Sequence, residues 1–196
     1  MVSNSRKGQF PDSSAILNIF MKNSLRTRMF LKSHKREVRF VLYFILFFIA
    51  LQIAHYSVRS YTSPLLVNTL NAQVSSRIIN FITPDEKSFS NGNIIGSGGF
   101  TIRIAQGCEG IEGILLITAA LCAFPLGMKQ KISGILTGSF IIYIANLTRI
   151  AVLYYTLKYR PGMFDLAHVY VGQTFIIVVG VLFFITWITN FAQSDE

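Results

Sequence analysis

Charged side chains are scarce in this sequence. They make up 14% of its 196 residues, against 52% hydrophobic residues, whereas soluble domains carry about 25% charged residues. Among the charged residues the acidic ones are the minority: the sequence has nine aspartates and glutamates and 18 lysines and arginines. A chain with so few charges lacks the polar surface of an ordinary soluble domain. The composition therefore predicts a polytopic membrane protein.

Cysteine is nearly absent too, with Cys108 and Cys122 as the two examples. If both lie on one helix, their Cα atoms are about 21 Å apart, and a disulfide requires about 7 Å or less. We therefore expect no bridge between them, and we expect Cys122 to be a small buried apolar residue. His, Cys and carboxylate residues show no metal-ligand spacing, so the sequence predicts neither a metal nor another cofactor.

The positive charge is concentrated in residues 1–39, which precede the first apolar run. Apolar residues recur among the charges at roughly helical spacing, which predicts a helix on the inner membrane surface within this cytoplasmic basic arm. Such an arm fixes topology and attracts anionic lipid. No aromatic-interleaved basic patch accompanies it, so nucleic acid is not an expected partner. The basic residues are Arg6, Lys7, Lys22, Arg26, Arg28, Lys32, Lys35, Arg36 and Arg39.

Four apolar segments are long enough to cross the hydrocarbon of a bilayer. They are residues 40–58, 108–127, 132–157 and 168–191. The basic arm lies before the first segment, and Lys129 and Lys131 mark a short loop between the second and the third. The positive-inside rule then places both termini in the cytoplasm and residues 59–107 outside. The predicted fold is an all-α multi-pass protein of the cytoplasmic membrane with about four transmembrane helices.

The outer loop, residues 59–107, has elements of its own. Ser63-Pro64 opens a predicted helix, which Pro84 ends. Asn91-Gly92 and the GSGG run at 96–99 then punctuate two short strands, the second of which leads directly to Cys108. The sequence thus predicts a small extracytoplasmic helix-plus-hairpin insertion. The apolar positions of its helix include Leu66, Leu70, Val74, Ile78 and Phe81.

Three reactive side chains, Cys108, Arg149 and His168, fall at the same end of three different apolar segments. Along a helix, Cys108 lies about 31 Å from Lys129 and Arg149 about 27 Å from Lys131, so both reach the outer edge of the hydrocarbon. Ionisable groups at this depth cost free energy and mark functional sites. A thiol, a guanidinium and an imidazole supply a nucleophile, an oxyanion partner and a proton carrier. The pattern predicts a membrane-embedded cysteine peptidase or transpeptidase.

Three further polar residues accompany them. Asn146 precedes Arg149 by three residues and shares its helix face, where it can bond a substrate carbonyl or a partner of the guanidinium. Asp165 precedes His168 by three residues and can fix the imidazole tautomer. Glu112 follows Cys108 by one helical turn and can pair with Arg149 or Arg103, or orient His168. The alternatives are an inert thiol, a snorkelling arginine, an interfacial histidine and a structural ion pair at Glu112.

These motifs together carry a resemblance. The run GFTIRIAQGCEGIEG at 99–113, Pro125 before a basic loop, NLTR at 146–149, and FDLAH at 164–168 with Gly172 resemble the exosortase/archaeosortase family. The resemblance covers residues 99–172 and assigns Cys108, Arg149 and His168 as the catalytic Cys, Arg and His. This chain departs from the family in having fewer spans than many members and in placing Glu109 where a small residue is common.

The resemblance implies an integral-membrane cysteine transpeptidase analogous to sortase. Its substrates would be exported proteins that end in a short motif, an apolar span and a basic tail. Two other functions stand beside this one. A thiol–disulfide oxidoreductase needs a second cysteine near Cys108, and the outer loop has none. A non-catalytic component of a polysaccharide-export or sorting assembly would use the polar residues for helix packing.

Overall fold

A computed structural model describes residues 35–105 and 107–191 of the chain. The predicted interfacial helix of the basic arm and the acidic tail lie outside these residues. The contacts divide the chain after Leu42, and the described part of the first unit, Lys35–Leu42, begins helix α2. The second unit, which starts at Tyr43, contains the rest of α2 and all the other described helices and strands. The predicted all-α polytopic membrane fold is confirmed, together with a small β-sheet.

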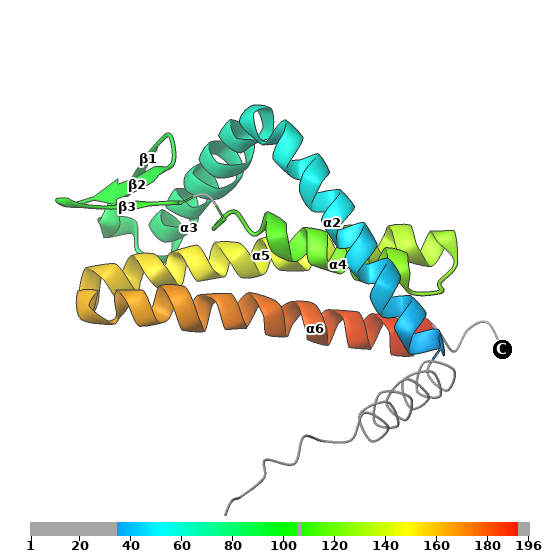
Figure 1. Ribbon diagram of the computed structural model, residues 1–196. Coiled ribbons are helices and arrows are strands. Elements are labelled where there is room, and N and C mark those ends of the chain that lie inside the picture. The colour runs from blue at the N-terminus through cyan, green and yellow to red at the C-terminus, as the bar shows by residue number, and fades with distance from the viewer. Residues whose placement is uncertain (1–34, 106, 192–196) are drawn as a thin grey trace, which may run out of the picture. The chain divides into compact units, whose positions relative to one another are not determined.

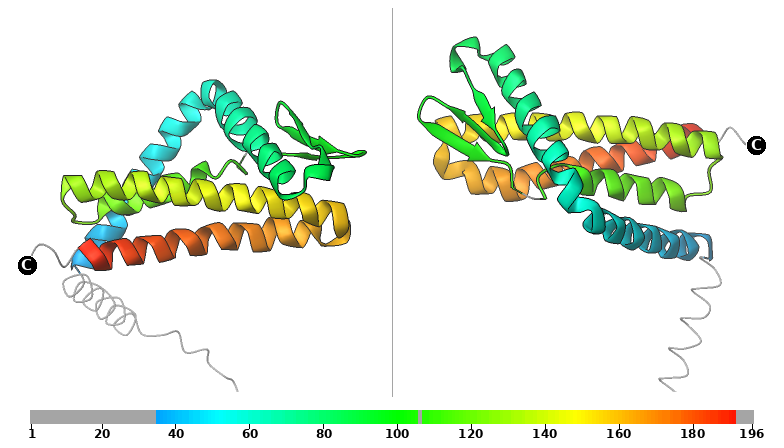
Figure 2. Two further views of the ribbon diagram at one scale, coloured as in Figure 1. Left: turned by 180° about the vertical axis from the view of Figure 1, so that it is seen from behind. Right: turned by 90° about the horizontal axis from the view of Figure 1, so that it is seen from above.

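Three described helical stretches are long and apolar enough to cross a membrane: Lys35–Ile82, Met128–Tyr159 and Leu166–Phe191. The first begins with α2 (Lys35–Ser63), the second is α5 (Met128–Tyr159), and the third ends with α6 (Gly172–Phe191). The predicted segments 40–58, 132–157 and 168–191 lie inside them. Helices α4 (Ile111–Ala123), α5 and α6 run side by side (Figures 1 and 2).

The helix α4 is shorter than the predicted segment 108–127. Its 13 residues rise about 20 Å, so the continuous helix of about 31 Å from Cys108 to Lys129 does not form. Pro125 lies in the non-helical stretch between α4 and α5, where a proline cannot continue the hydrogen-bond ladder. The Nζ of Lys131 donates to the carbonyl of Cys122 at 2.8 Å and so satisfies one of the open carbonyls at the end of α4.

Residues 64–105 form a compact insertion between α2 and the segment that carries Cys108. A π-helical segment, Pro64–Gln73, continues into α3 (Val74–Ile82), and a short 3-10 turn follows at Pro84–Glu86. Strands β1 (Phe89–Asn91), β2 (Ile94–Ser97) and β3 (Phe100–Arg103) then form an antiparallel sheet in the order β1-β2-β3. The sheet therefore has one strand more than the predicted hairpin, and β3 leads toward Cys108 as expected.

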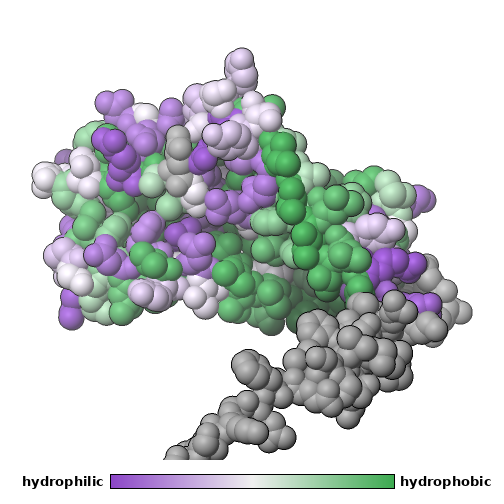
Figure 3. Space-filling view, viewed as in Figure 1, coloured by the Kyte–Doolittle hydropathy of each residue, from purple (hydrophilic) through white to green (hydrophobic). Residues whose placement is uncertain are grey.

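Two hydrophobic clusters hold these elements. One packs the π-helical segment, α3 and the sheet on α5, through residues such as Ile79, Ile95, Ile102 and Tyr154. The other packs α4 between α5 and α6 through Ile117, Leu121, Ile142 and Ile176. Because both clusters contain residues of α5, this helix fixes the insertion and the helix bundle relative to each other. In Figure 3, hydrophilic residues gather on the end of the molecule that holds the sheet.

A buried carboxylate ties the insertion to the end of α5. Glu86 is 6% exposed, accepts a hydrogen bond of 2.6 Å from the Tyr154 hydroxyl, and forms an ion pair with Lys158. Ser97 of β2 donates to the Glu86 carbonyl. The hydrogen bond from Lys158, followed by the one from Tyr154, lowers the pKa of Glu86 below its ordinary value. The carboxylate is therefore charged at neutral pH, and the ion pair holds the sheet beside α5.

Candidate active site

The three predicted reactive side chains meet in one place. The sulfur of Cys108 lies 3.9 Å from Nε2 of His168 and 4.0 Å from Nη2 of Arg149. The same Nη2 donates to the backbone carbonyl of His168 at 3.5 Å. The three residues come from a loop, from α5 and from a second π-helical segment, Leu166–Val171. Segments far apart in the sequence thus bring a thiol, an imidazole and a guanidinium within contact distance.

Cys108 lies in the loop ahead of α4, not on the helix itself. Gly107 and Gly110 adopt positive φ of 90° and 79°, a backbone region that other residues rarely adopt. These two glycines turn the chain sharply on both sides of the cysteine, and Gly110 then caps the start of α4. The thiol is half-buried and free of any disulfide.

Burial raises the pKa of the Cys108 thiol, and the nearby guanidinium of Arg149 opposes that rise. The effect of burial is the larger of the two, so the pKa of the thiol lies above its ordinary value. The thiol needs a base to remove its proton, and Nε2 of His168 is within reach. His168 is therefore placed to act as a base, one of the two tasks of the predicted proton carrier.

Arg149 is turned inward. Its exposed fraction is 8%, and its Nε is buried without an acceptor among residues 35–105 and 107–191. A snorkelling arginine would carry its charge out to water, so this alternative does not describe Arg149. Buried arginine without a carboxylate partner leaves donors open for another anion. The guanidinium is positioned to stabilise negative charge that develops next to Cys108.

His168 is held by an aromatic ring and not by the expected carboxylate. Phe164 stacks on the imidazole with ring centroids 5.7 Å apart and an interplanar angle of 3°. Nδ1 of His168 is buried with no hydrogen-bond partner in the part of the chain that the structure describes. The predicted bond from Asp165 is not made, because Asp165 is exposed. Phe164, just before this π-helical segment, and His168 within it form the stacked pair that the sequence interpretation missed.

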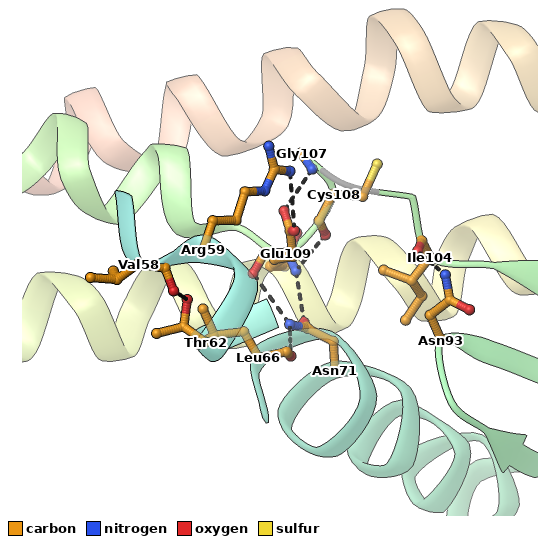
Figure 4. Close-up of polar contacts among 11 residues, drawn as sticks. Val58, Arg59, Thr62, Leu66, Asn71, Asn93, Ile104, Gly107, Cys108 and Glu109 are labelled. Atoms are coloured by element: carbon orange, nitrogen blue, oxygen red, sulfur yellow. Dashed lines mark hydrogen bonds and ion pairs between the residues drawn. The ribbon is translucent and has the colours of Figure 1, made fainter. Parts of the chain in front are cut away.

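Asn146 is fully buried and faces the loop that carries Cys108. Its Nδ2 donates to the Cys108 carbonyl at 3.1 Å and to Oδ1 of Asn71 at 3.0 Å. Asn71, on the first π-helical segment, in turn donates to the Glu109 carbonyl at 3.3 Å and to the Leu66 carbonyl at 2.7 Å. Figure 4 shows this network beside the loop. Asn146 thus contacts the backbone of Cys108, whose sulfur is a neighbour of the guanidinium.

The two glutamates beside Cys108 differ in their surroundings. Glu109 is 7% exposed, accepts from the backbone N–H of Gly107 at 2.6 Å and pairs with Arg59 of α2 at 3.6 Å. Glu112 is exposed on the first turn of α4 and makes no ion pair within the described ranges. The predicted pairing of Glu112 with Arg149 or Arg103 is therefore not formed. The residue that departs from the family pattern, Glu109, instead braces the loop.

Gly172 allows the guanidinium to reach its place. A Cβ atom built on Gly172 would lie 2.6 Å from Nε of Arg149 and 3.1 Å from the carbonyl of Ala167. We expect Gly172→Ala to displace Arg149 and to lower activity roughly 10- to 100-fold, because small misplacements at a reacting centre have effects of that size. Gly180→Ala is the matched control on the same helix, since its nearest neighbours would lie at 3.7 Å. Equal rates for the two variants, measured on one substrate, would contradict this.

Comparison with known proteins places the whole chain in context. A family model described as transmembrane exosortase matches residues 29–185. This match extends well beyond residues 99–172 and includes α2, the insertion and most of α6. No curated protein and no solved structure gives a significant match.

Proposed function

Because the chain belongs to the transmembrane exosortase family, we propose that it is a membrane-embedded cysteine transpeptidase that acts on exported proteins. The observation that carries the proposal is the meeting of the Cys108 sulfur with His168 at 3.9 Å and Arg149 at 4.0 Å. We further propose that both termini are cytoplasmic and that the site opens at the outer face of the cytoplasmic membrane. The basic arm and the Lys129–Lys131 loop support this orientation.

The reaction begins with proton transfer from the Cys108 thiol to Nε2 of His168. The sulfur then attacks a peptide carbonyl carbon, and the carbonyl oxygen becomes an oxyanion that Arg149 stabilises. When the tetrahedral intermediate collapses, the C–N bond breaks and His168 returns the proton to the leaving amine. An amine, a hydroxyl or water next attacks the thioester carbon and gives its proton to His168. The C–S bond then breaks, and His168 returns the proton to the sulfur, which restores the Cys108 thiol.

A cavity next to these residues suits a substrate with an apolar segment. It has a volume of about 190 Å³ and reaches Gly107 and Arg149 at the reaction centre. Apolar side chains of α2, α4 and α6, among them Phe48, Leu116 and Ile176, line much of the rest, together with the polar Gln52, Glu112 and Gln173. A transmembrane segment that follows the scissile bond could approach Cys108 through this side of the bundle. We propose that substrates carry a C-terminal motif, an apolar span and a basic tail.

The test is to delete the gene in its own host and to follow exported proteins that end in such a tripartite signal. We expect them to keep their C-terminal segment and to stay in the membrane in the deletion strain, and to be shortened again when the gene is restored. Mass spectrometry of the C-terminal peptides measures this directly. Unchanged C-termini in the deletion strain would reject the proposed substrates. A non-catalytic assembly component would be distinguished by the Cys108 variant considered in the Discussion.

A further inference from the structure

In the loop that carries Cys108, two successive backbone carbonyls are held by hydrogen bonds from buried asparagines. The Cys108 carbonyl accepts from Asn146 and the Glu109 carbonyl accepts from Asn71. Asn146 also donates a hydrogen bond of 3.0 Å to Asn71, and the two residues are 0% and 2% exposed, respectively. Asn71 and Asn146 together form a buried pair that we call the clamp. In Figure 4 the Glu109 carbonyl oxygen faces Asn71, whereas the Cys108 sulfur points away from it.

Because the clamp fixes two carbonyls, it also fixes the direction of the N–H group in each of the same two peptide units. In a planar trans peptide the carbonyl of one residue and the N–H of the next point in opposite directions. The N–H of Glu109 therefore points away from Asn146, and the N–H of Gly110 points away from Asn71. Both N–H groups thus point away from the clamp, as the Cys108 sulfur points away from Asn71 in Figure 4. Among residues 35–105 and 107–191, neither N–H has an acceptor.

We infer that the backbone N–H groups of Glu109 and Gly110 form an oxyanion hole, and that Asn71 and Asn146 are the positioning residues that orient it. Successive open N–H groups next to a glycine with positive φ bind anions well, and the N-terminus of α4 adds its partial positive charge. Gly110 also brings the loop against the clamp, because a Cβ atom there would lie 2.9 Å from Asn146. The hole would act together with the charge of Arg149.

This inference rests on the proposed function only in taking Cys108 as the nucleophile. Its test can therefore avoid the natural substrate. In full-length protein with Cys122→Ala, Cys108 is the single remaining cysteine. Iodoacetamide alkylates it by displacement at carbon, which creates no oxyanion. The ester p-nitrophenyl acetate acylates it through a tetrahedral intermediate, which does. The ratio of the two rates isolates the contribution of the oxyanion hole.

We expect Asn71→Leu to lower the acetylation rate at least tenfold, because lost oxyanion donors have effects of this order or larger, and to leave the alkylation rate within about twofold. Asn93→Leu is the matched control, because the Asn93 carboxamide also donates to a backbone carbonyl, that of Ile104 at 3.2 Å, but makes no hydrogen bond to residues 107–110. This control should leave the ratio unchanged.

A second variant covers the case in which leucine prevents folding. Asn71→Asp keeps the shape and can accept from Asn146, but it cannot donate to the Glu109 carbonyl, so the ratio should fall here as well. Acetylation and alkylation that decline in parallel would overturn the inference, since Asn71 would then hold only the thiol or the fold. An unchanged acetylation rate would overturn it too. Failure to find a sorting substrate would leave the measured ratio unaffected and would count against the proposed function alone.

Discussion

Cys108→Ala should abolish processing of exported substrates, with a loss of roughly 10⁴-fold or more, as is usual when a nucleophile is removed. The protein itself should remain at normal levels in the membrane. The side chain of Cys108 is half-buried and forms no disulfide, and its contact with the clamp is made by the backbone carbonyl, which alanine retains. Processing is measured by the mass of the released protein, and protein level by immunoblot of the membrane fraction.

Cys122→Ala provides the internal control for this experiment. Cys122 lies on α4, away from His168 and Arg149, and its backbone carbonyl accepts a hydrogen bond from Lys131. We expect activity close to that of the unaltered protein. If Cys108→Ala restored processing in the deletion strain, the chain would be a non-catalytic component of an assembly. If Cys122→Ala were the inactive variant, the nucleophile would have been assigned to the wrong cysteine.

The positions of the long helices could be predicted from sequence because hydrophobic length alone determines them. The segments 40–58, 132–157 and 168–191 each lie within a helical stretch of spanning length. Cys108 was expected at the start of such a helix, at the outer edge of the hydrocarbon. It lies instead in a turn between Gly107 and Gly110, which depends on positive φ angles. Apolar periodicity carries no information about such a turn.

The clamp could not be predicted, because the buried side of the helix in the insertion is not its most apolar side. Leu70 and Phe81, which the periodicity selects, are 37% and 88% exposed, whereas Asn71 and Ser75 are buried. In membrane proteins small and polar residues often form the packed face while large apolar residues face lipid. The π-helical geometry of Pro64–Gln73 also shifts the register from the α-helical period. The available clue in the sequence was the carboxamide of Asn71 within this apolar run.

The surroundings of the imidazole show a similar limit. A spacing of three residues placed Asp165 and His168 on one helix face, but Leu166–Val171 is π-helical, so this spacing does not have its usual meaning. Phe164, four residues before His168, stacks on the ring instead. By contrast, Arg149 lies in regular helix α5. From there its guanidinium reaches the Cys108 sulfur.

Arg149→Lys should lose most of the activity, roughly 100-fold, although the charge is kept. The guanidinium contacts both the Cys108 sulfur and the His168 carbonyl through one nitrogen, while its remaining donors stay available. A lysine ammonium is a compact point charge and cannot reproduce this planar fork. Arg149→Ala should lose at least as much, since removing an oxyanion partner has an effect of this order. Rates are compared on a tagged substrate at equal enzyme level.

The matched control is Arg103→Lys. Arg103 is an exposed arginine on β3, close in sequence to the nucleophile, and the same substitution there should change the rate less than about twofold. Both variants should remain inserted in the membrane, which the immunoblot checks. A lysine at position 149 that processes substrate at nearly the original rate would show that charge alone is required. The oxyanion would then depend on the backbone N–H groups of Glu109 and Gly110, and the acylation ratio of the Asn71 variants would measure their share.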